Sequence, residues 1–249
     1  MTDVPIFVLN WKTNPSSLKD AEKLFSKTKE LTSKTKAIFI TCAPFPYLYH
    51  LKKLGISKKM YLGAQNVATI LDGAETGGVS APMLRGAGVT SVIVGHSEER
   101  ALGEINSVIN RKVITALKGG LTPILCIGEK ERDHGVWYLH EVKKQLEECL
   151  QGVSKKELKN IMIAYEPVWA IGASAVRNAT AEESQEMAIY IRKVLSDLFD
   201  AKTAGGISIL YGGSVDESNA KNFLVEGGVQ GLLVGRASLD PKKIVAMIS

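Results

Sequence analysis

One carboxylate in this chain stands where it could act as a general base. Glu166 follows an apolar run, Ile161–Tyr165, that is typical of a β-strand, and it precedes a segment rich in Pro, Trp and Gly. A strand end is rigid and a loop mouth is open, so a carboxylate placed there can be held firmly and still face a substrate. The same position also fits a glutamate that simply faces solvent, because charged residues often follow strands.

Polar residues stand at the ends of other apolar runs as well. These places hold Asn10 and Lys12, Gly95 to Glu98, Cys126 with Glu129, Gly212 to Ser214, and Gly235 with Arg236. Three potential catalytic side chains, Lys12, His96 and Glu166, thus fall after apolar runs together with two glycine-rich turns.

Each of these residues has an ordinary structural explanation when taken alone. Lys12 could be a surface lysine, His96 a hydrogen-bonded buried histidine, and the pair Gly212-Gly213 a tight turn. The functional interpretation is favoured because all of these residues follow predicted strands. The remaining histidines, His50, His134 and His140, fall in stretches with helical spacing and carry no comparable signal.

The elements that must position these residues alternate regularly. The apolar runs are Ile6–Leu9, Ala37–Thr41, Tyr61–Ala64, Ser91–Val94, Pro123–Ile127, Ile161–Tyr165, Ile207–Tyr211 and Gly231–Val234. Each is followed by apolar residues at helical spacing, so we expect eight strands alternating with eight helices. Continuous apolar strands predict a parallel sheet covered by helices, and eight of them predict a closed (β/α)8 barrel. An open, doubly wound sheet is the alternative, but no GxGxxG follows the first strand.

The helix signals agree with this arrangement. Thr180 and Glu183 form a capping box ahead of a predicted helix over Ala181–Phe199, and Pro241 suits the first turn of another helix. The loop that begins at Pro167 is a candidate lid over the strand ends. Its predicted residues are Pro167, Val168, Trp169, Ala170, Ile171, Ala173 and Ser174.

Composition excludes several classes of protein. The chain has 249 residues, of which 45% are apolar and 23% charged, and no linker divides it, so we expect one domain over residues 1–249. The net charge of +5 comes from lysines without interleaved aromatic residues, which argues against nucleic-acid binding. The cysteines, Cys42, Cys126 and Cys149, suggest reduced thiols in a cytoplasm. Without a signal-like N-terminus or a membrane-length apolar run, a soluble protein is expected.

The glycine-rich turns indicate a phosphate site. Glycine lets the backbone approach an anion closely, so that successive N–H groups can donate to its oxygens. In barrels of this kind the loops after strands seven and eight often bind phosphate. Here those loops carry Gly212-Gly213-Ser214 and Gly235-Arg236.

Taken in order, these motifs resemble the triosephosphate isomerase family. The matching segments are Asn10-Trp11-Lys12, Gly95 to Glu98, Tyr165 to Gly172, Tyr211 to Val215 and Leu233 to Gly235, and they run from the first strand to the last helix. The resemblance implies a TIM barrel that interconverts dihydroxyacetone phosphate and glyceraldehyde 3-phosphate. No metal or organic cofactor is implied, since the substrate's own carbonyl is the electron sink.

The resemblance also implies roles for individual residues. Glu166 would move the proton, while neutral His96 and Lys12 would stabilise the enediolate oxygen. Asn10 would help to orient it, and Glu98 would pair with Lys12. Gly172, Ser214, Gly235 and the backbone of Arg236 would hold the phosphate. The chain would form a homodimer through the loop Gly73–Val79.

The chain departs from the family pattern in four places. The lid is longer by about two residues after Gly172, which surface loops tolerate. Arg236 replaces a glycine of the phosphate site. Gly78 and Glu99 stand where the family has an acid and a basic residue that would pair across the dimer, so we expect a weaker interface.

Two other functions remain open from the sequence. One is an isomerase of another phosphorylated ketose, such as a four-carbon sugar, which the altered lid would favour. The other is a phosphate-binding scaffold without catalysis, and the presence of Asn10, Lys12, His96 and Glu166 argues against it because a binding module needs no base.

Overall fold

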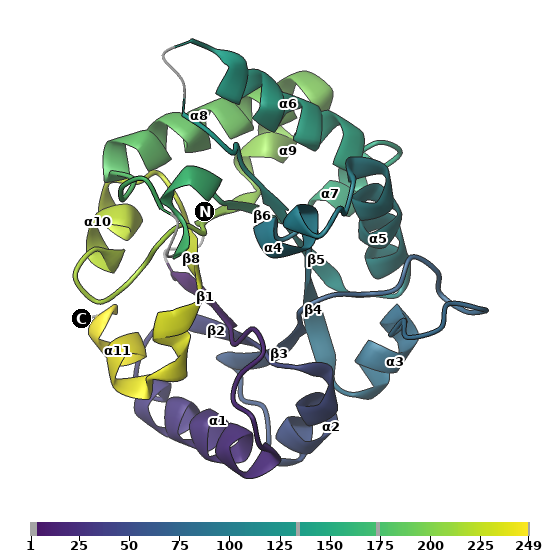
Figure 1. Cartoon of the computed structure of the whole chain (residues 1–249), viewed down its shortest axis with the longest axis vertical. Helices are drawn as coiled ribbons and strands as arrows, with labels where there is room; N and C mark the ends of the chain where they lie inside the picture. The colour runs from purple at the N-terminus through teal and green to yellow at the C-terminus, as the bar shows by residue number, and fades with distance from the viewer. Residues whose placement is uncertain (1–3, 133–134, 173–174, 249) are drawn as a thin grey trace.

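The computed structural model describes residues 4–132, 135–172 and 175–248, and in it eight parallel strands close into a barrel (Figure 1). The strands pair in sequence order around the ring, and the first also pairs with the eighth. They are β1 (Ile6–Asn10), β2 (Ile38–Cys42), β3 (Met60–Ala64), β4 (Val89–Val94), β5 (Thr122–Ile127), β6 (Met162–Tyr165), β7 (Ser208–Tyr211) and β8 (Gly231–Val234). The predicted barrel is thus confirmed.

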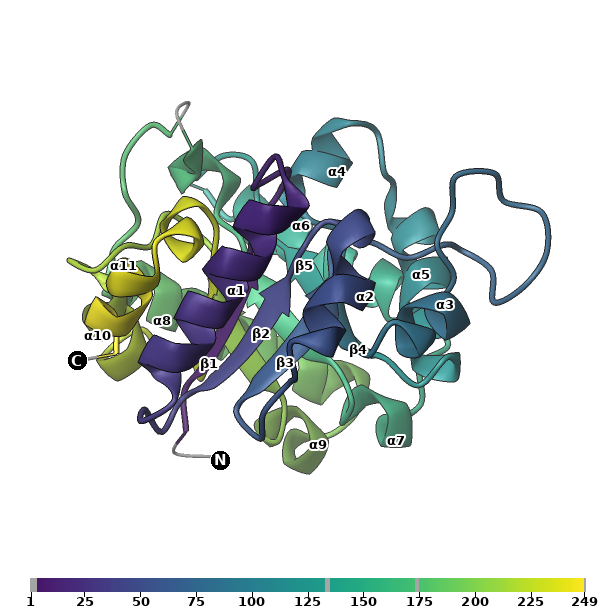
Figure 2. The same cartoon turned by 90° about the horizontal axis from the view of Figure 1, so that it is seen from below.

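Helices surround the barrel in the views of Figures 1 and 2. The α-helices are α1 (Leu18–Thr32), α2 (Phe45–Lys53), α3 (Ala81–Gly86), α4 (Ser97–Ala101), α5 (Asn106–Lys118), α6 (Trp137–Cys149), α7 (Lys155–Leu158), α8 (Ala181–Leu198), α9 (Ala201–Gly205), α10 (Ala220–Val225) and α11 (Pro241–Ala246). Two short 3-10 helices, η1 (Val168–Ala170) and η3 (Arg236–Leu239), lie in the loops after β6 and β8. None of the helices in the described part of the chain has the length and apolar character needed to cross a membrane.

The strands are mostly apolar because both of their faces are buried. One set of side chains fills the interior of the barrel, and the alternate set packs under the helices. The interior holds Ile6, Val8, Ile40, Cys42, Ile93, Ile124, Cys126, Ala164, Leu210 and Leu233. Phe7, Leu9 and Phe39 belong to the outer core, where the rings of Phe7 and Phe39 stack with centroids 5.5 Å apart.

The predicted strand bounds differ from the observed ones by no more than two residues. The largest difference is in β4, which begins at Val89 rather than Ser91. Thr90, a polar residue, interrupts the apolar run there, yet it fits the sheet because its hydroxyl donates to the carbonyl of Leu62 (3.2 Å). A polar residue near the end of a strand can therefore make the first residues of the strand hard to recognise from the sequence.

The prediction of one helix per strand was wrong for three of the connections. Within the described residues, two α-helices follow each of β4, β5 and β6, and the 3-10 helix η1 lies between β6 and its two α-helices. The breaks occur at short helices of four or five residues, α4, α7 and α9, which carry too little apolar periodicity to be recognised. His50 and His140 do lie in helices, whereas His134 falls outside the described residues.

The expected helix signals near the lid are confirmed. The Thr180 hydroxyl accepts from the Glu183 backbone N–H (3.2 Å), and the Glu183 carboxylate accepts from the Thr180 backbone N–H (2.9 Å). The helix α8 that they open ends at Leu198, one residue earlier than predicted, because Phe199 leaves the helical region with φ −126° and ψ −83°. Pro241 is the first residue of α11.

Candidate active site

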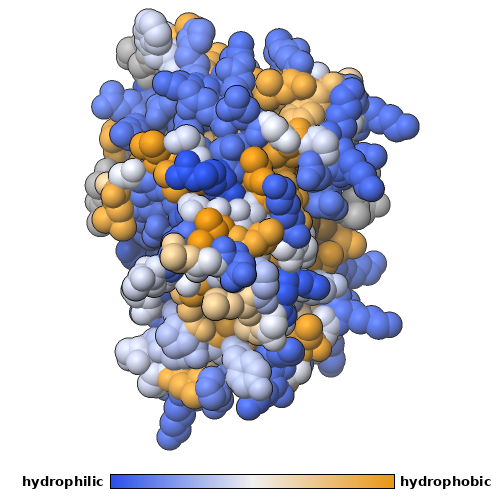
Figure 3. Space-filling model, turned by 90° about the vertical axis from the view of Figure 1, so that its right-hand side faces the viewer, coloured by the Kyte–Doolittle hydropathy of each residue, from blue (hydrophilic) through white to orange (hydrophobic). Residues whose placement is uncertain are grey.

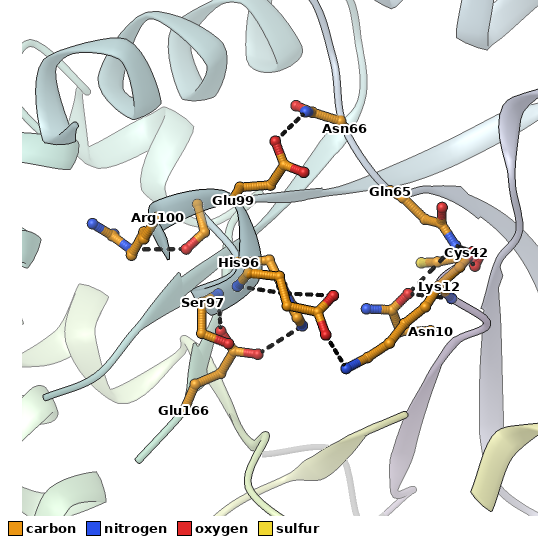
Figure 4. Close-up of polar contacts among 12 residues, drawn as sticks. Asn10, Lys12, Cys42, Gln65, Asn66, His96, Ser97, Glu99, Arg100 and Glu166 are labelled. Carbon is orange, nitrogen blue, oxygen red and sulfur yellow. Dashed lines mark hydrogen bonds and ion pairs between the residues drawn. The ribbon is translucent and has the colours of Figure 1, made fainter. Parts of the chain in front are cut away.

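Glu166 lies directly after β6 and is almost fully buried, with 2% of its surface exposed. Its backbone N–H donates to the carbonyl of Ile127 at the end of β5 (2.7 Å). Its carboxylate faces the loop after β4: Oε2 accepts from the Ser97 backbone N–H (2.8 Å), and Oε1 lies 3.1 Å from Nε2 of His96 (Figure 4). A buried carboxylate is tolerated here because both of its oxygens have a donor.

The hydrogen bonds around His96 define its tautomer. Nδ1 accepts from the backbone N–H of Glu98 (3.2 Å), so this nitrogen carries no proton. The Glu98 carboxylate is 3.8 Å from Nδ1, too far for a hydrogen bond. The proton of the neutral ring is then on Nε2, which points at Glu166. His96 can therefore donate a hydrogen bond without carrying a positive charge.

Lys12 reaches the same cleft from β1. Its Nζ donates to Oε1 of Glu98 (2.5 Å), with 34% and 59% of the two side chains exposed. Ion pairs this exposed are weak, so an incoming anion can compete for the ammonium group. The backbone of Lys12 has φ +52°, a left-handed conformation that costs a non-glycine residue roughly 1–3 kcal/mol.

Two side chains hold Lys12 in that conformation. The Asn10 carboxamide accepts from the Lys12 backbone N–H (3.0 Å), and Gln65 donates to the Lys12 carbonyl (2.7 Å). Gln65 also donates to the Cys42 carbonyl (3.0 Å) and lies 3.4 Å from the Asn10 oxygen. Gln65 was not predicted as a site residue from the sequence. The signal available was its place directly after β3, the same kind of position that drew attention to Glu166.

Glycines around Glu166 are required by close packing. A Cβ on Gly128 would lie 1.8 Å from the carbonyl oxygen of Glu166, and one on Gly212 would lie 3.0 Å from its Cγ. A Cβ on Gly213 would meet the Tyr211 hydroxyl at 2.1 Å. Gly212 and Gly213 are thus sites of close approach, and neither has a positive φ. The requirement for glycine at position 128 was not recognised from the sequence, because it arises from the close contact between the chain after β5 and the chain after β6.

The predicted lid begins with the 3-10 helix η1, which a buried glutamate anchors. Oε1 of Glu129 accepts from the Trp169 indole N–H (2.7 Å) and from the Tyr165 hydroxyl (2.8 Å), while its carbonyl accepts from the Val168 N–H (3.0 Å). Burial raises the pKa of the Glu129 carboxyl, and the hydrogen bonds from Trp169 and Tyr165 oppose that rise. Glu129 therefore lies behind the lid rather than in the cleft.

The loop after β7 is tied to the lid. The Ser214 hydroxyl donates to the carbonyl of Ala170 (2.8 Å), and Arg177 stacks on the Trp169 ring with its guanidinium carbon 4.6 Å from the ring centre. Ala173 and Ser174, two of the predicted lid residues, lie outside the described residues.

Cys126, flagged at the end of strand five, lies inside the barrel and is fully buried. Burial raises the pKa of its thiol well above the usual value, and the Glu166 carboxylate raises it further. A thiol with a raised pKa is a poor nucleophile, so Cys126 does not contribute that chemistry.

The cleft has a volume of about 930 Å³ and collects residues from most strand ends. The predicted site residues that line it are Asn10, Lys12, His96, Glu98, Glu166, Ile171, Gly172, Ser214, Gly235 and Arg236. The predicted lid residues Pro167, Val168, Trp169 and Ala170 do not line it. Another hollow of about 510 Å³ lies by α1 and the start of β3, where Lys29 and Lys59 already donate to backbone carbonyls.

The chemistry open to this cleft is proton transfer. It combines a buried carboxylate, a neutral imidazole that presents N–H, and a lysine ammonium group. Within the described residues no group of His, Cys, Asp and Glu side chains is placed to hold a metal ion.

Comparison with known proteins gives a consistent result. The sequence model of the family described as triosephosphate isomerase matches residues 5–249. The chain is 39% identical to the triosephosphate isomerase of Alkaliphilus oremlandii over 98% of both chains. It is 42% identical to that of Chlorobium phaeobacteroides over 98% of this chain and 97% of the relative. The corresponding protein of Dictyoglomus thermophilum is 40% identical over 95% of each chain.

Proposed function

The chain belongs to the triosephosphate isomerase family, and we propose how its residues divide the work of that reaction. The activity is the interconversion of dihydroxyacetone phosphate and glyceraldehyde 3-phosphate. The observation that carries the assignment of roles is the contact between the Glu166 carboxylate and His96 Nε2, at 3.1 Å, inside the cleft that Lys12 also faces.

Glu166 is the base in this proposal. It removes a proton from the carbon that carries the hydroxyl group, and the electrons of that C–H bond form the double bond of an enediolate. The charged oxygen takes the Nε2 proton of His96, and His96 recovers a proton from the hydroxyl on the first carbon, whose oxygen becomes the new carbonyl. Glu166 returns its proton to the neighbouring carbon, which takes up the electrons of the double bond. Its hydrogen bonds to Ser97 and His96 must be exchanged for contact with substrate during this cycle. The buried surroundings exclude water that would otherwise compete for the proton.

His96 and Lys12 stabilise the oxygen on which charge develops. With its proton on Nε2, His96 can donate to that oxygen, and the Lys12 ammonium adds a positive charge from the opposite strand. Pairing of a glutamate base with a neutral histidine is established chemistry of this enzyme family, so the assignment itself is not new. Asn10 acts through Lys12, whose backbone it holds, and Glu98 keeps the ammonium aimed at the cleft.

In this proposal the phosphate group binds between the loops after β6, β7 and β8. Gly172, Ser214, Gly235 and the backbone of Arg236 would surround it, and all four residues line the same hollow. Gly172 has φ +74°, a conformation that favours glycine. The bond between Ser214 and Ala170 couples this region to the lid.

A homodimer is part of the proposal. Figures 1 and 2 both show the loop between β3 and α3 projecting away from the barrel. The predicted dimer segment Gly73–Val79 lies in its second half, and Val79 accepts from the Ala68 N–H (2.9 Å) at the base of the loop. Apolar side chains on flanking elements are exposed, among them Met83 (64%) and Leu102 (85%). Figure 3 shows hydrophobic patches among the polar side chains on this side of the molecule. Exposed apolar surface of this kind is typical of an interface.

Two acidic side chains near this loop, Glu75 and Glu99, have local partners. Glu75 closes the loop on itself by accepting from the Thr69 N–H (3.0 Å) and hydroxyl (2.8 Å). Glu99 accepts from the Asn66 amide (3.1 Å). The loop therefore keeps its own internal order, while the basic residue expected at position 99 is missing. We keep the proposal of a dimer weaker than is usual for the family.

A cytoplasmic location completes the proposal, since the buried Cys42, Cys126 and Cys149 are free thiols. The activity is tested directly by a coupled assay with dihydroxyacetone phosphate. Turnover of the three-carbon substrate well above that of a four-carbon ketose phosphate supports the function, and the reverse ratio would overturn it. No observation favours the four-carbon substrate.

A further inference from the structure

Arg236 lies on the wall of the active-site cleft, and its guanidinium group has no partner in the described part of the chain. The residue follows β8, opens η3 and lines the cleft next to Gly235. Among the residues that the structure describes, none forms a hydrogen bond, ion pair or ring contact with its side chain. A free guanidinium on the wall of a binding cleft is available to a ligand.

The other charged side chains on the cleft wall are already engaged. The cation Lys12 pairs with Glu98, and Lys243 pairs with Glu217 (2.9 Å). Among the acids, Asp216 accepts from the Ser218 hydroxyl (2.5 Å) and Asp240 from the Lys242 backbone N–H (2.9 Å). Glu166 is bound by Ser97 and His96. An incoming anion therefore meets one uncommitted positive charge on the described wall, that of Arg236.

We propose that the Arg236 side chain is a substrate-binding residue that donates directly to the phosphate oxygens. This rests on the proposed function, and it adds a charged contact to a site for which backbone N–H groups were expected to suffice. Guanidinium presents two parallel N–H donors that match two phosphate oxygens, which lysine cannot do. The contact favours ligands whose terminal group is an anion with at least two oxygens, as a phosphate has.

The proposed contact acts on binding more than on the chemical step. The phosphate does not react, so Arg236 holds it equally in the ground state and the transition state. An interaction of that kind changes KM and leaves kcat nearly constant. It also depends on salt, because the guanidinium is exposed and its charge is screened.

The test compares Arg236→Gln and Arg236→Lys with the native protein, and with Lys242→Gln as the matched control. Lys242 is an exposed cation six residues along the chain that does not line the cleft, so its loss changes net charge equally. KM and kcat for dihydroxyacetone phosphate and Ki for inorganic phosphate are measured at low and high ionic strength. We expect Arg236→Gln to raise KM and Ki about tenfold at low salt, as for an exposed charge-assisted contact. Arg236→Lys should recover only part of this loss.

Two further results distinguish a direct contact with phosphate from a general effect of net charge and from a change in the folded structure. The slow isomerisation of D-glyceraldehyde, which has no phosphate, should be the same in Arg236→Gln and the native protein. Lys242→Gln should leave KM and Ki unchanged. Equal Ki values for native protein and Arg236→Gln, or equal effects of Arg236→Gln and Lys242→Gln, would overturn the proposal. Failure of the proposed function would look different, because the native protein would then lack turnover and phosphate competition.

Discussion

At the scale of single residues, Glu166 is held between two donors that it must release. The Ser97 N–H and His96 bind its two oxygens, and the same imidazole must turn its proton toward substrate. The carboxylate is thus stored in a hydrogen-bonded position that does not yet face a carbon atom. Substrate binding has to replace these two hydrogen bonds with contacts of similar strength. Glu166 can therefore act as a base only when substrate occupies the cleft.

Glu166→Gln tests the role of the base. The amide oxygen can still accept from the Ser97 N–H, so the fold and the binding of phosphate should persist. Turnover should fall by at least roughly 10²–10⁴-fold, the loss typical of a missing general base. Steady-state kinetics measure the loss, and thermal unfolding together with Ki for phosphate serves as the control. Near-native turnover would remove Glu166 from this role.

Lys12→Ala and His96→Gln should differ in which kinetic constant they change. Lys12 carries a charge that attracts the anionic substrate and also faces the reacting oxygen, so its loss should raise KM and lower kcat. His96 donates to the oxygen as charge develops, so His96→Gln should act mainly on kcat, by roughly 10²–10³-fold for one such donor. The assignment of His96 would be wrong if its substitution changed KM alone.

Residues that follow a strand were predictable, whereas residues that act through a neighbouring strand were not. Asn10, Lys12, His96 and Glu166 all stand within three residues of the end of an apolar run, and strand ends meet at one rim of a parallel barrel. Gln65 acts by reaching three groups on β1 and β2, and Gly128 by its contact with the backbone after β6. Those requirements arise from the register between strands, which no single run of residues reveals.

At the scale of elements, the loops after β6, β7 and β8 converge on one corner of the cleft. Gly172, Ser214 and Gly235 come from these three loops, and Ser214 bonds to η1 across the gap. Strand positions could be predicted well because both faces of each strand are buried and the runs are continuous. The short helices could not, since four or five residues show no clear period.

Competition by anions tests this corner. Inorganic phosphate and 2-phosphoglycolate should both inhibit competitively with substrate, and more strongly at low salt because surface charges are then less screened. A crystal soaked with 2-phosphoglycolate should show its phosphate beside Gly172, Ser214 and Gly235. Density for the anion at another place would refute the proposed phosphate site.

The short helix α9 depends on an ionised cap. Asp200 accepts from the Thr203 N–H (2.7 Å), and that bond, with contacts to Lys155 and the Thr203 hydroxyl, lowers its pKa to about 2 from 3.8. A lowered pKa in the folded state means that the charged form stabilises the fold above pH 3.8 and that this stabilisation is lost as the pH falls toward 2. Asp200→Ala should therefore lower Tm at neutral pH.

The pH dependence of that variant gives the stricter check. The difference in Tm between Asp200→Ala and the native protein should shrink as the pH is lowered through the window from 3.8 to about 2. Asp200→Asn, which keeps a capping oxygen, serves as the control and should show a smaller loss. A difference in Tm that stays constant across this window would contradict the role of the charge.

At the scale of the whole molecule, one side carries the projecting loop and exposed apolar side chains that no other described part of the chain covers. Glu104 also has one buried oxygen without a hydrogen-bond partner among the described residues, although Lys112 binds the other oxygen. Lys112 also donates to Asn66 at the base of the loop (2.8 Å). The base of the loop is therefore firmly built, whereas its tip is exposed.

The dimer prediction couples assembly to activity. If the tip around Thr76 docks near Asn10 of a second copy, dissociation should loosen the residues after β1 and lower specific activity. Analytical ultracentrifugation across a dilution series, with activity measured on the same samples, checks both effects. Met83→Lys should shift dissociation to higher concentration by placing a charge on the apolar face. A monomer that is fully active at every concentration would separate catalysis from assembly.

The pairing of β1 with β8 means that the barrel itself has no first strand. The register between Ile6 and Gly231 closes the ring in the same way as the pairings between sequence neighbours, and α1 packs against α11. The order of strands in the gene is therefore one of several cyclic orders that give the same geometry. A circularly permuted chain that opens in the exposed turn at residues 33–36 and joins the former ends by a short linker keeps every strand neighbour. The break would lie at the opposite end of the barrel from Glu166, so the catalytic rim would be assembled from the same loops in a different order of synthesis.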